Sequence, residues 1–391
     1  MAITVETQQK TIITVVVLFG LLVNVFLYFG TKEGHPHLHS KPYTIPKKQT
    51  KYFHRFSDGN HFAGQAPVAI NFTIVLYVVP HWMKYDHSAY ISQFCEYRNC
   101  RVTTNRTNLR NQSAILFILN SGPGVPTRPP ISPSERNPDQ AWVFMWYEAP
   151  IRHTANFGIY KNIFWRNSAN WTASFSDNAD IVHPLGTFEK RTPPTRNYSE
   201  IFQRKNKTAA WLVSNCKTPS RREDYVKKLR KHGIEVDIYG KCAGNQADEN
   251  KTLALIDKSY KFYLSFENSL CKDYITEKFY KYYKLDVILI VRGGGNYSRL
   301  LPGNAYINTA DFSSTAELAA YLNKVASSEQ LYTNYLRNKD GYASIREELG
   351  RGSIFCGICD KLNNLDDNRK YYTNLLDIIH NGTCNSPNDI I

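Results

Sequence analysis

Several features that mark common protein classes are missing from this chain of 391 residues. No internal repeat and no low-complexity block is present, so a repeat architecture is not expected. The three glycines at 293–295 lack GxGxxG spacing and a following helix pattern, which favours a turn over a dinucleotide-binding loop. Only one CxxC motif occurs, at 356–359, so it could form half a zinc site, a redox pair or two structural disulfides.

Charge is absent from residues 11–29, TIITVVVLFGLLVNVFLYF, and this run predicts one membrane-spanning helix. No small-x-small cleavage site precedes Gly30, which disfavours the alternative of an unusually long signal peptide. One lysine precedes the span and four follow it by residue 48, and this count taken alone favours a cytoplasmic body.

Two other features predict that the body lies in the secretory lumen. No cysteine precedes the span and all eight follow it, which suits disulfides in an oxidising compartment. Large domains can translocate despite flanking charge, so we expect the amino terminus to be cytoplasmic. Nine N-glycosylation sequons also follow the span, where chance would give roughly four; they lie at Asn71, Asn105, Asn111, Asn170, Asn197, Asn206, Asn250, Asn296 and Asn381.

The remaining chain is long enough for two domains. Residues 31–65 contain few aliphatic side chains and predict a stem. The 26 tyrosines favour a tyrosine-rich core over a sugar-stacking surface. The net charge of +14 fits an anionic ligand such as a nucleotide diphosphate, an anionic membrane surface or simple solubility.

Strand and helix patterns alternate through the body, most regularly in its second half. Strands are expected at 70–79, 114–119, 142–146, 208–213, 234–239, 262–266 and 287–291, with a loop at 122–138. Helices are expected from Ser220, Thr276 and Ser314 to about 232, 284 and 325, and the first and third begin with a capping box. The pattern predicts βαβ units and parallel sheets, whose ligands bind beyond the carboxyl ends of the strands.

Glu148 directly follows the apolar strand at 142–146, and Pro150 stops that strand. A carboxylate at such a position can face a cleft and serve as a general base, because partial desolvation raises its pKa. The position alone favours an ordinary surface glutamate at a strand end.

A second candidate site follows the strand at 262–266. Glu267 and Asn268 end this strand, and Thr276 is a natural N-cap whose helix would offer amides to a diphosphate. Glu277 could accept hydrogen bonds from ribose hydroxyls, and Lys278 could neutralise the charge of a departing phosphate. Arg222, which follows Ser214 and Asn215 at the end of another strand, could meet phosphate with a bidentate guanidinium.

These segments resemble the α1,3-fucosyltransferase family. The stretch YKFYLSFENSLCKDYITEKFY, 260–280, is similar to the donor-site signature of that family over its whole length. Further matching segments stand in the family's order across 142–335; they are YEAP at 147–150, NWTASFSDNADIVHPLG at 170–186, AWLVSN at 210–215, VDIYGKC at 236–242, NY at 296–297 and DFSSTAELAA at 311–320. The family's Tyr-Arg pair before 180 is absent here, although Asp180 is kept.

The resemblance implies roles for individual residues. Glu148 matches the general base, and Asp180 is the next candidate for that role. The positions that match those holding the GDP-fucose donor are Arg222, Asn268, Tyr274, Glu277 and Lys278. Further donor-site candidates are Ser214, Asn215, Tyr239 and Glu267. No metal is expected to be required in the active site, although a divalent cation such as Mn²⁺ or Mg²⁺ can stimulate.

The resemblance also implies a fold of two facing Rossmann-like domains, the GT-B type, with partners that include GDP-fucose, a glycan acceptor and the Golgi membrane, and no nucleic acid. The expected organisation is a cytoplasmic tail at 1–10, an anchor at 11–29, a stem at 30–65, an acceptor domain at 66–195, a donor domain at 196–350 and a disulfide-tied tail at 351–391. Cys95 and Cys100 are expected to pair with Cys356 and Cys359, and Cys216 with Cys242; the partners of Cys271 and Cys384 stay open.

The activity implied is inverting transfer of L-fucose from GDP-β-L-fucose to the 3-hydroxyl of a GlcNAc residue in a glycoprotein or glycolipid glycan. The sequence does not choose among an N-glycan core, a lactosamine and a LacdiNAc acceptor. Two alternatives stay open: a membrane-anchored lectin-like protein without turnover, which the missing arginine motivates, and a transferase for another nucleotide sugar.

Overall fold

The chain divides into two compact units, 1–41 and 42–391. The computed structural model describes residues 69–79, 87–119, 125–151, 163–244, 248–346, 353–374, 379 and 383–390. The predicted cytoplasmic tail, anchor and stem, and the sequon at Asn381, lie outside these residues. Within the described ranges, no helix has both the length and the apolar character needed to cross a bilayer.

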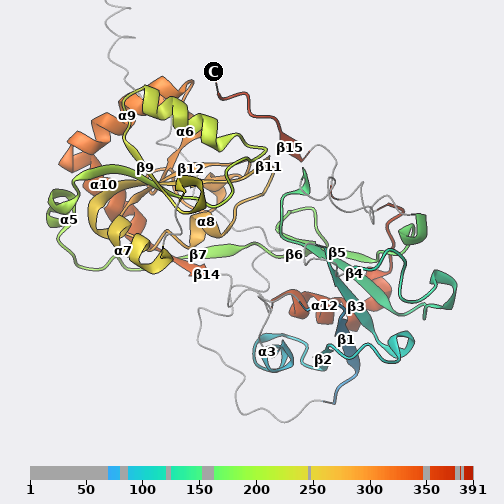
Figure 1. Cartoon of the computed structure of the whole chain (residues 1–391). Coiled ribbons are helices and arrows are strands. Elements are labelled where there is room, and N and C mark those ends of the chain that lie inside the picture. Colours follow the sequence, from blue (N-terminus) through green and yellow to red (C-terminus); the bar gives the residue numbers. More distant parts are fainter. Residues whose placement is uncertain are drawn as a thin grey trace, which may run out of the picture. The chain divides into compact units, whose positions relative to one another are not determined.

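Six parallel strands form the first sheet, in the order β2-β1-β3-β4-β5-β6 (Figure 1). Their bounds are Phe72–Leu76 for β1, Cys100–Thr103 for β2, Ala114–Ile118 for β3, Ala141–Trp146 for β4, Trp171–Ser174 for β5 and Ile181–Val182 for β6. Strands β3 and β4 are apolar and buried at every position, as expected where both faces of a parallel sheet are covered. The predicted strands of this half are confirmed, although β1 is shorter than 70–79.

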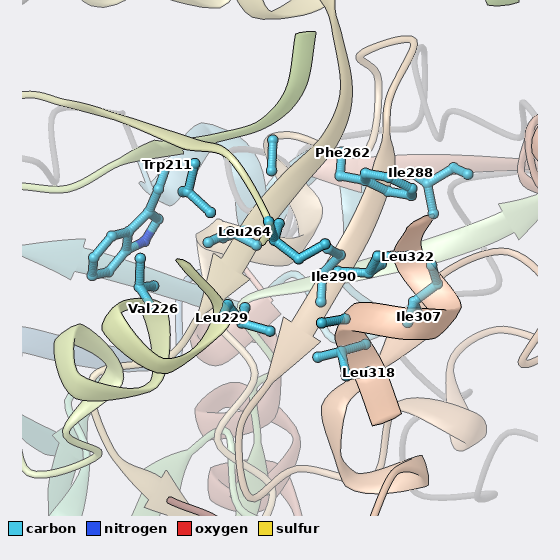
Figure 2. Close-up of a cluster of buried hydrophobic side chains, with 14 of the residues drawn as sticks. Trp211, Val226, Leu229, Phe262, Leu264, Ile288, Ile290, Ile307, Leu318 and Leu322 are labelled. Atoms are coloured by element: carbon cyan, nitrogen blue, oxygen red, sulfur yellow. The ribbon is translucent and has the colours of Figure 1, made fainter. Parts of the chain in front are cut away.

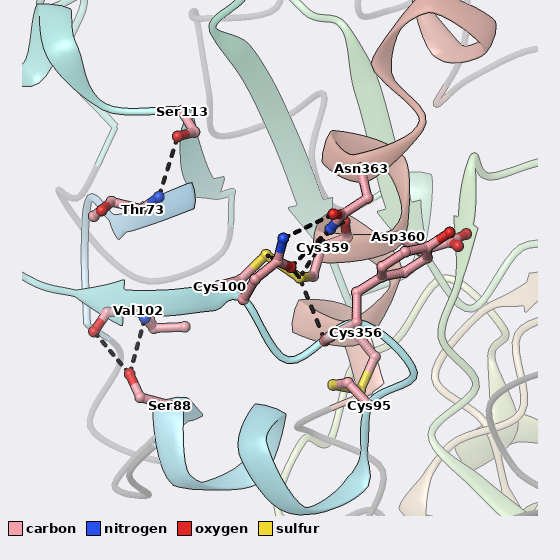
Figure 3. Close-up of a disulfide and its surroundings, with 12 residues drawn as sticks. Thr73, Ser88, Cys95, Cys100, Val102, Ser113, Cys356, Cys359, Asp360 and Asn363 are labelled. Carbon is pink, nitrogen blue, oxygen red and sulfur yellow. Dashed lines mark hydrogen bonds between the residues drawn. A yellow bond between two sulfur atoms is a disulfide. The ribbon is translucent and has the colours of Figure 1, made fainter. Parts of the chain in front are cut away.

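The helix α12, Ser353–Asn363, belongs to the core of this first sheet although it lies near the end of the chain. Its residues Ile354, Phe355 and Ile358 are fully buried, among side chains from β1, β3 and β4. Two disulfides, Cys95–Cys356 and Cys100–Cys359, join α12 to the segment that runs from helix α3, His87–Phe94, into β2 (Figure 3). These pairings are the expected ones, so the CxxC motif forms neither a zinc site nor a redox pair.

Five parallel strands form the second sheet, in the order β13-β12-β10-β8-β9. Their bounds are Lys207–Leu212 for β8, Val236–Tyr239 for β9, Tyr260–Phe266 for β10, Ile288–Arg292 for β12 and Ile307–Asn308 for β13. One face packs against helices α6, Arg222–Lys231, and α9, Thr315–Ser327. Figure 2 shows Val226 and Leu229 of α6 and Leu318 and Leu322 of α9 beside the strand side chains. The expected α/β fold with parallel sheets is therefore confirmed.

Further helices and strands complete the second half of the described chain. The helices are α5, Tyr198–Arg204, α7, Glu249–Ser259, and α10, Glu329–Asp340. Strand β7, Gly186–Lys190, pairs antiparallel with β14, Tyr342–Arg346. Strand β11, Leu270–Cys271, pairs antiparallel with β15, Cys384–Asn385, and a disulfide links Cys271 to Cys384. The expected Cys216–Cys242 disulfide is also present.

One helix start differs from the sequence-based expectation, and a second differs only in the partner of its glutamate. The capping box predicted at Ser220 is wrong, because the Ser220 hydroxyl donates to the Glu267 carbonyl and α6 begins at Arg222 without a side-chain cap. The Glu223 carboxylate accepts instead from the Thr218 amide, at 3.2 Å. Ser314 does cap α9, while Glu317 reaches back one residue further, to Ser313.

Candidate active site

The buried carboxylate of Glu267 organises the loop that follows β10. Its side chain is fully buried and accepts hydrogen bonds from the Thr276 amide at 2.8 Å and from the Thr276 hydroxyl at 2.9 Å. The Lys278 ammonium lies 3.4 Å from the same carboxylate. Three donors therefore neutralise a group whose burial without partners would be strongly unfavourable, and they hold the two ends of the loop together.

Lys278 is a cation held in place at this edge of the sheet. Its ammonium donates to the Thr276 hydroxyl at 2.8 Å and pairs with Glu277 at 3.0 Å, and 22% of its side chain is exposed. Burial lowers the pKa of Lys278, but the carboxylates of Glu267 and Glu277 outweigh burial and raise it above the ordinary value. Burial raises the pKa of Glu267. Lys278 therefore stays positively charged where a phosphate could reach it.

The helix that Thr276 caps is much shorter than predicted. Helix α8 covers only Glu277–Tyr280, so the expectation of a helix to about Lys284 is wrong. The Thr276 amide already donates its hydrogen bond to Glu267. A diphosphate at this edge would therefore meet the Lys278 ammonium more than an array of helix amides, because one turn supports little macrodipole.

The glycines at 293–295 pack against the same loop. A β-carbon at Gly294 would lie 2.6 Å from backbone atoms of Cys271, and one at Gly295 would lie 2.3 Å from a side-chain carbon of Ile275. Such distances leave no room for a side chain, so the turn after β12 needs glycine in order to contact the loop closely. The sequence identified the turn but not this reason for it.

Arg222 supports the site from inside the protein. Its guanidinium donates to the Phe266 carbonyl at 2.6 Å and to the Asn215 carbonyl at 3.1 Å, and only 4% of the residue is exposed. Burial lowers the pKa of this guanidinium. Two of its donors thus join the ends of β10 and of the loop after β8, whereas the sequence suggested direct contact with phosphate. Ser214 and Asn215 themselves are exposed.

Several buried polar atoms at this edge lack a hydrogen-bond partner within the described part of the chain. They are Arg222 Nε, Asn268 Oδ1 and Ser269 Oγ. An unsatisfied buried polar atom costs about 1–3 kcal/mol, so a group of them marks a place where water or a ligand completes the hydrogen bonding.

Glu148 and Tyr274 bring the first sheet and the loop into contact. Glu148 follows β4 and is half-buried, and the Tyr274 hydroxyl donates to its carboxylate at 3.3 Å. Burial, and next the charge of Glu148, raise the pKa of Tyr274 well above its usual value, so this hydroxyl keeps its proton. The Tyr274 ring also lies 5.1 Å from that of Phe175. The candidate base and the loop after β10 therefore meet.

Asp180, the second candidate for a base, is occupied by structural contacts. Its carboxylate accepts from the Thr172 amide at 2.8 Å and from the Tyr372 hydroxyl at 2.8 Å, and it pairs with Lys370. These partners contact both oxygens of the carboxylate and hold the segment around β5.

The segment that lacks the family's Tyr-Arg pair instead carries Asp177. This carboxylate pairs with Arg299, and the Asp177 amide donates to the Asp273 carboxylate at 3.2 Å. Asp273 has a φ of 61°, a left-handed conformation that aspartate tolerates better than most residues. A cavity of about 50 Å³ lies among these three side chains, and it is large enough only for a few water molecules.

Two predicted donor-site residues are placed differently from the rest. Tyr239 ends β9 at the carboxyl edge of the parallel sheet, but its hydroxyl lies 2.5 Å from that of Tyr260, the first residue of β10, and contacts none of the other predicted donor-site residues in the described hydrogen bonds. Glu277 has 53% of its side chain exposed and contacts Lys278. The structure thus gathers Glu148, Glu267, Asn268, Tyr274 and Lys278 around one loop and leaves Tyr239 apart.

Three residues of the site escaped the sequence analysis. Ser220, Arg292 and Asp389 link the end of the chain to Glu267 by hydrogen bonds described below. An arginine at the end of an apolar strand was the single local signal, and no pattern pointed from it to Asp389. Within the described ranges, no group of three or more His, Cys, Asp or Glu side chains is arranged to hold a metal ion.

Two family models match most of the described chain. Residues 71–186 match the family model described as "Fucosyltransferase, N-terminal", and residues 202–378 match "Glycosyltransferase family 10 (fucosyltransferase) C-term". The first match covers the first sheet up to the start of β7, and the second begins just before β8.

Curated relatives extend the similarity over most of the chain. Alpha-(1,3)-fucosyltransferase fut-6 of Caenorhabditis elegans is 32% identical over 280 residues, which cover 68% of each chain. Alpha-(1,3)-fucosyltransferase 7 of Bos taurus is 32% identical over 70% of this chain and 75% of its own. Glycoprotein 3-alpha-L-fucosyltransferase A of Drosophila melanogaster is 32% identical over 78% of this chain but only 59% of its own.

A solved α1,3-fucosyltransferase has a similar fold. It superposes with a TM-score of 0.52 over 79% of this chain and 94% of its own, at 15% sequence identity.

Proposed function

The chain belongs to the fucosyltransferases of glycosyltransferase family 10, and from this we propose that it transfers L-fucose from GDP-β-L-fucose to the 3-hydroxyl of a GlcNAc residue. The names of its relatives support an α1,3 linkage. The observation that carries the proposal is the hydrogen bond between Glu148 and Tyr274, because it brings a carboxylate to the loop that Glu267 and Lys278 organise.

The proposed reaction is a single displacement with inversion. The acceptor hydroxyl oxygen forms a bond to the anomeric carbon of fucose, and its proton passes to Glu148. The bond between that carbon and the diphosphate oxygen breaks, and GDP leaves with the electron pair. Inversion of a β-linked donor yields an α linkage.

The departing diphosphate gains negative charge, and Lys278 is the side chain best placed to oppose it. Its ammonium is fixed by Thr276 and Glu277, so little reorganisation is needed as that charge grows. Asn268 and Tyr274 are the other residues of the resemblance that lie at this loop. Arg222 and Glu267 act through them, because both are buried and hold the backbone of the loop.

The setting proposed for this reaction is the Golgi lumen, with the span at 11–29 as a type II anchor and facing donor and acceptor domains of the GT-B type. The sequons and the four disulfides support an oxidising secretory compartment. We propose that no metal is required at the site, since Lys278 supplies positive charge there, and that a divalent cation can stimulate.

The test is a donor panel with the purified full chain. GDP-fucose, GDP-mannose, UDP-galactose and UDP-GlcNAc are each offered with a lactosamine, a LacdiNAc and an N-glycan core acceptor, and products are identified by mass spectrometry and linkage analysis. We expect transfer from GDP-fucose alone, in an α1,3 linkage. Transfer from another sugar nucleotide would contradict the proposed donor, and glycan binding without turnover would support a lectin-like protein instead.

A further inference from the structure

We propose that Arg292 and Asp389 are positioning residues for the donor, and that the C-terminal segment Thr383–Ile390 straps the donor-binding loop in place. The inference rests on the proposed function, because it concerns the nucleotide diphosphate that this loop would bind.

The Arg292 guanidinium is buried at the end of β12 and is satisfied from two sides. Its Nε and Nη2 donate to the two carboxylate oxygens of Asp389 at 2.7 and 2.6 Å. Its Nη1 donates to the Ser220 carbonyl at 2.8 Å, and the guanidinium lies 4.7 Å from the centre of the Tyr225 ring. Only 1% of the Arg292 side chain is exposed, against 38% for Asp389. The counter-charge of a buried cation therefore comes from a residue close to the end of the chain.

Hydrogen bonds lead from Arg292 directly to the strand end that carries the site. The Glu267 amide donates to the Arg292 carbonyl at 2.8 Å. The Ser220 hydroxyl donates to the Glu267 carbonyl at 2.8 Å, and the Ser220 amide donates to the Asn268 carbonyl at 3.0 Å. Arg292 and Ser220 thus hold the backbone of Glu267 and Asn268 in place by hydrogen bonds.

The position of Glu267 then determines the position of Lys278. The Glu267 carboxylate binds the Thr276 amide and hydroxyl, and Thr276 in turn accepts from the Lys278 ammonium. A shift of the Glu267 backbone would therefore move the cation proposed to meet the diphosphate. Displacements of about 1 Å at a binding site can cost up to about 100-fold in activity.

The tail has further attachments on both sides of the Arg292 contact. The disulfide Cys271–Cys384 and the β11–β15 pairing fasten it to the start of the loop, and the Lys272 amide donates to the Thr383 carbonyl at 2.6 Å. At the far end the Lys228 ammonium of α6 donates to the Ile390 carbonyl at 3.1 Å. The segment therefore runs from the loop, past the end of β12, to the helix that begins at Arg222.

The inference is tested with Asp389→Asn, which keeps the shape of the side chain and removes its charge. Asp389→Glu is the conservative rescue, and Asp366→Asn, which removes a carboxylate from an exposed pair with Arg369, is the matched control. Each purified full chain is assayed for kcat, for the KM of GDP-fucose and of the acceptor, for GDP affinity by calorimetry and for Tm. We expect Asp389→Asn to weaken GDP binding and raise the donor KM on the order of tenfold, with the acceptor KM unchanged. Asp389→Glu should recover most of this loss, and Asp366→Asn should match the wild type.

A lower Tm for Asp389→Asn with unchanged GDP affinity and donor KM would overturn the inference, because the contact would then brace only the fold. If Asp389→Asn does not fold, Arg292→Lys takes its place, since lysine keeps the charge but cannot form the bidentate pair with Asp389. The same rise in donor KM is expected, and its absence is again a contradiction. If the wild-type chain does not bind GDP, the proposed function is overturned as well. If the wild type transfers fucose normally and the variant keeps the GDP affinity and donor KM of the wild type, only the positioning role is overturned.

Discussion

The Tyr274 hydroxyl donates a hydrogen bond to the Glu148 carboxylate at 3.3 Å, although 126 residues separate them in the chain. Glu148 follows a strand of the first sheet, while Tyr274 lies in the loop that follows β10 of the second. The contact orients the carboxylate that is proposed to take the proton of the acceptor hydroxyl. It is therefore the first place to test the proposed chemistry.

Glu148→Gln should lower kcat by roughly 10²–10⁴, the usual contribution of a positioned base. Glutamine can still accept the hydrogen bond from Tyr274 but takes no proton from the acceptor. GDP affinity should change little, since the proposed role of Glu148 concerns the acceptor. Steady-state kinetics and calorimetry check both expectations, with the exposed Glu135→Gln as control. Near-normal transfer by Glu148→Gln would show that another residue is the general base.

Lys278→Ala should weaken GDP binding and transfer together, each by about 10- to 100-fold, because a hydrogen bond to a charged group contributes about 1.5–3 kcal/mol. The substitution also leaves the buried Glu267 carboxylate without its cation, so a lower Tm is expected. Lys281→Ala is the matched control, since Lys281 follows three residues later and pairs with Glu249. Equal GDP affinity in Lys278→Ala and the wild type would exclude a donor-binding role.

Gly294→Ala should destabilise the chain by about 1–3 kcal/mol and reduce GDP affinity, because the new methyl group would overlap the backbone of Cys271. Denaturant unfolding and calorimetry measure the two effects. Gly303→Ala is the control, since a β-carbon there has no atom within 4 Å. If the two variants behave alike, close packing of the glycine turn on the loop does not matter for the site.

Lys205→Met should remove part of the pH dependence of stability. Burial lowers the pKa of Lys205 to about 7, whereas in the unfolded chain it is about 10.4. Between these values the unfolded state binds the extra proton, so folding becomes more favourable as pH rises, by up to about 1.4 kcal/mol per pH unit.

The free energy of unfolding is measured between pH 6.5 and 9 for the wild type, for Lys205→Met and for a control at the exposed Lys251. As pH rises, the free energy of unfolding of the wild type should increase relative to that of Lys205→Met. Parallel curves of unfolding free energy against pH would contradict the proposal that Lys205 has a lowered pKa in the folded protein.

Asn170 should carry no glycan, although it stands in a sequon. Its side-chain oxygen accepts from the Trp142 amide at 2.8 Å and from Arg136 at 2.9 Å, and its side-chain nitrogen donates to the Lys370 carbonyl at 2.8 Å. Peptide mapping of protein from secretory cells should find Asn170 unmodified and the exposed Asn206 and Asn250 available for modification. A glycan at Asn170 would require that these bonds form differently or not at all.

Local patterns predicted β1, β3 and β4 of the first sheet, β8, β9, β10 and β12 of the second, the N-caps at Thr276 and Ser314 and the strand-end position of Glu148. They missed the short strands β2, β5, β6 and β13. The predicted features depend on residues a few positions apart, where side-chain periodicity and capping chemistry act directly. The resemblance added three disulfides, which the structure confirms, and assignments of the base and the donor loop, which stay predictions.

The sequence by itself indicated alternating strands and helices with parallel sheets, and tertiary structure decided which distant residues meet. The Ser220 hydroxyl bonds the Glu267 carbonyl instead of capping a helix, and Tyr239 turns to Tyr260. Likewise α12 packs into the first sheet, Cys384 pairs with Cys271, and Asp389 reaches Arg292 across 97 residues. Such contacts leave no periodic pattern in the sequence. Because the entropy of loop closure grows only slowly with loop length, distant residues can pair, and packing geometry selects which of them do.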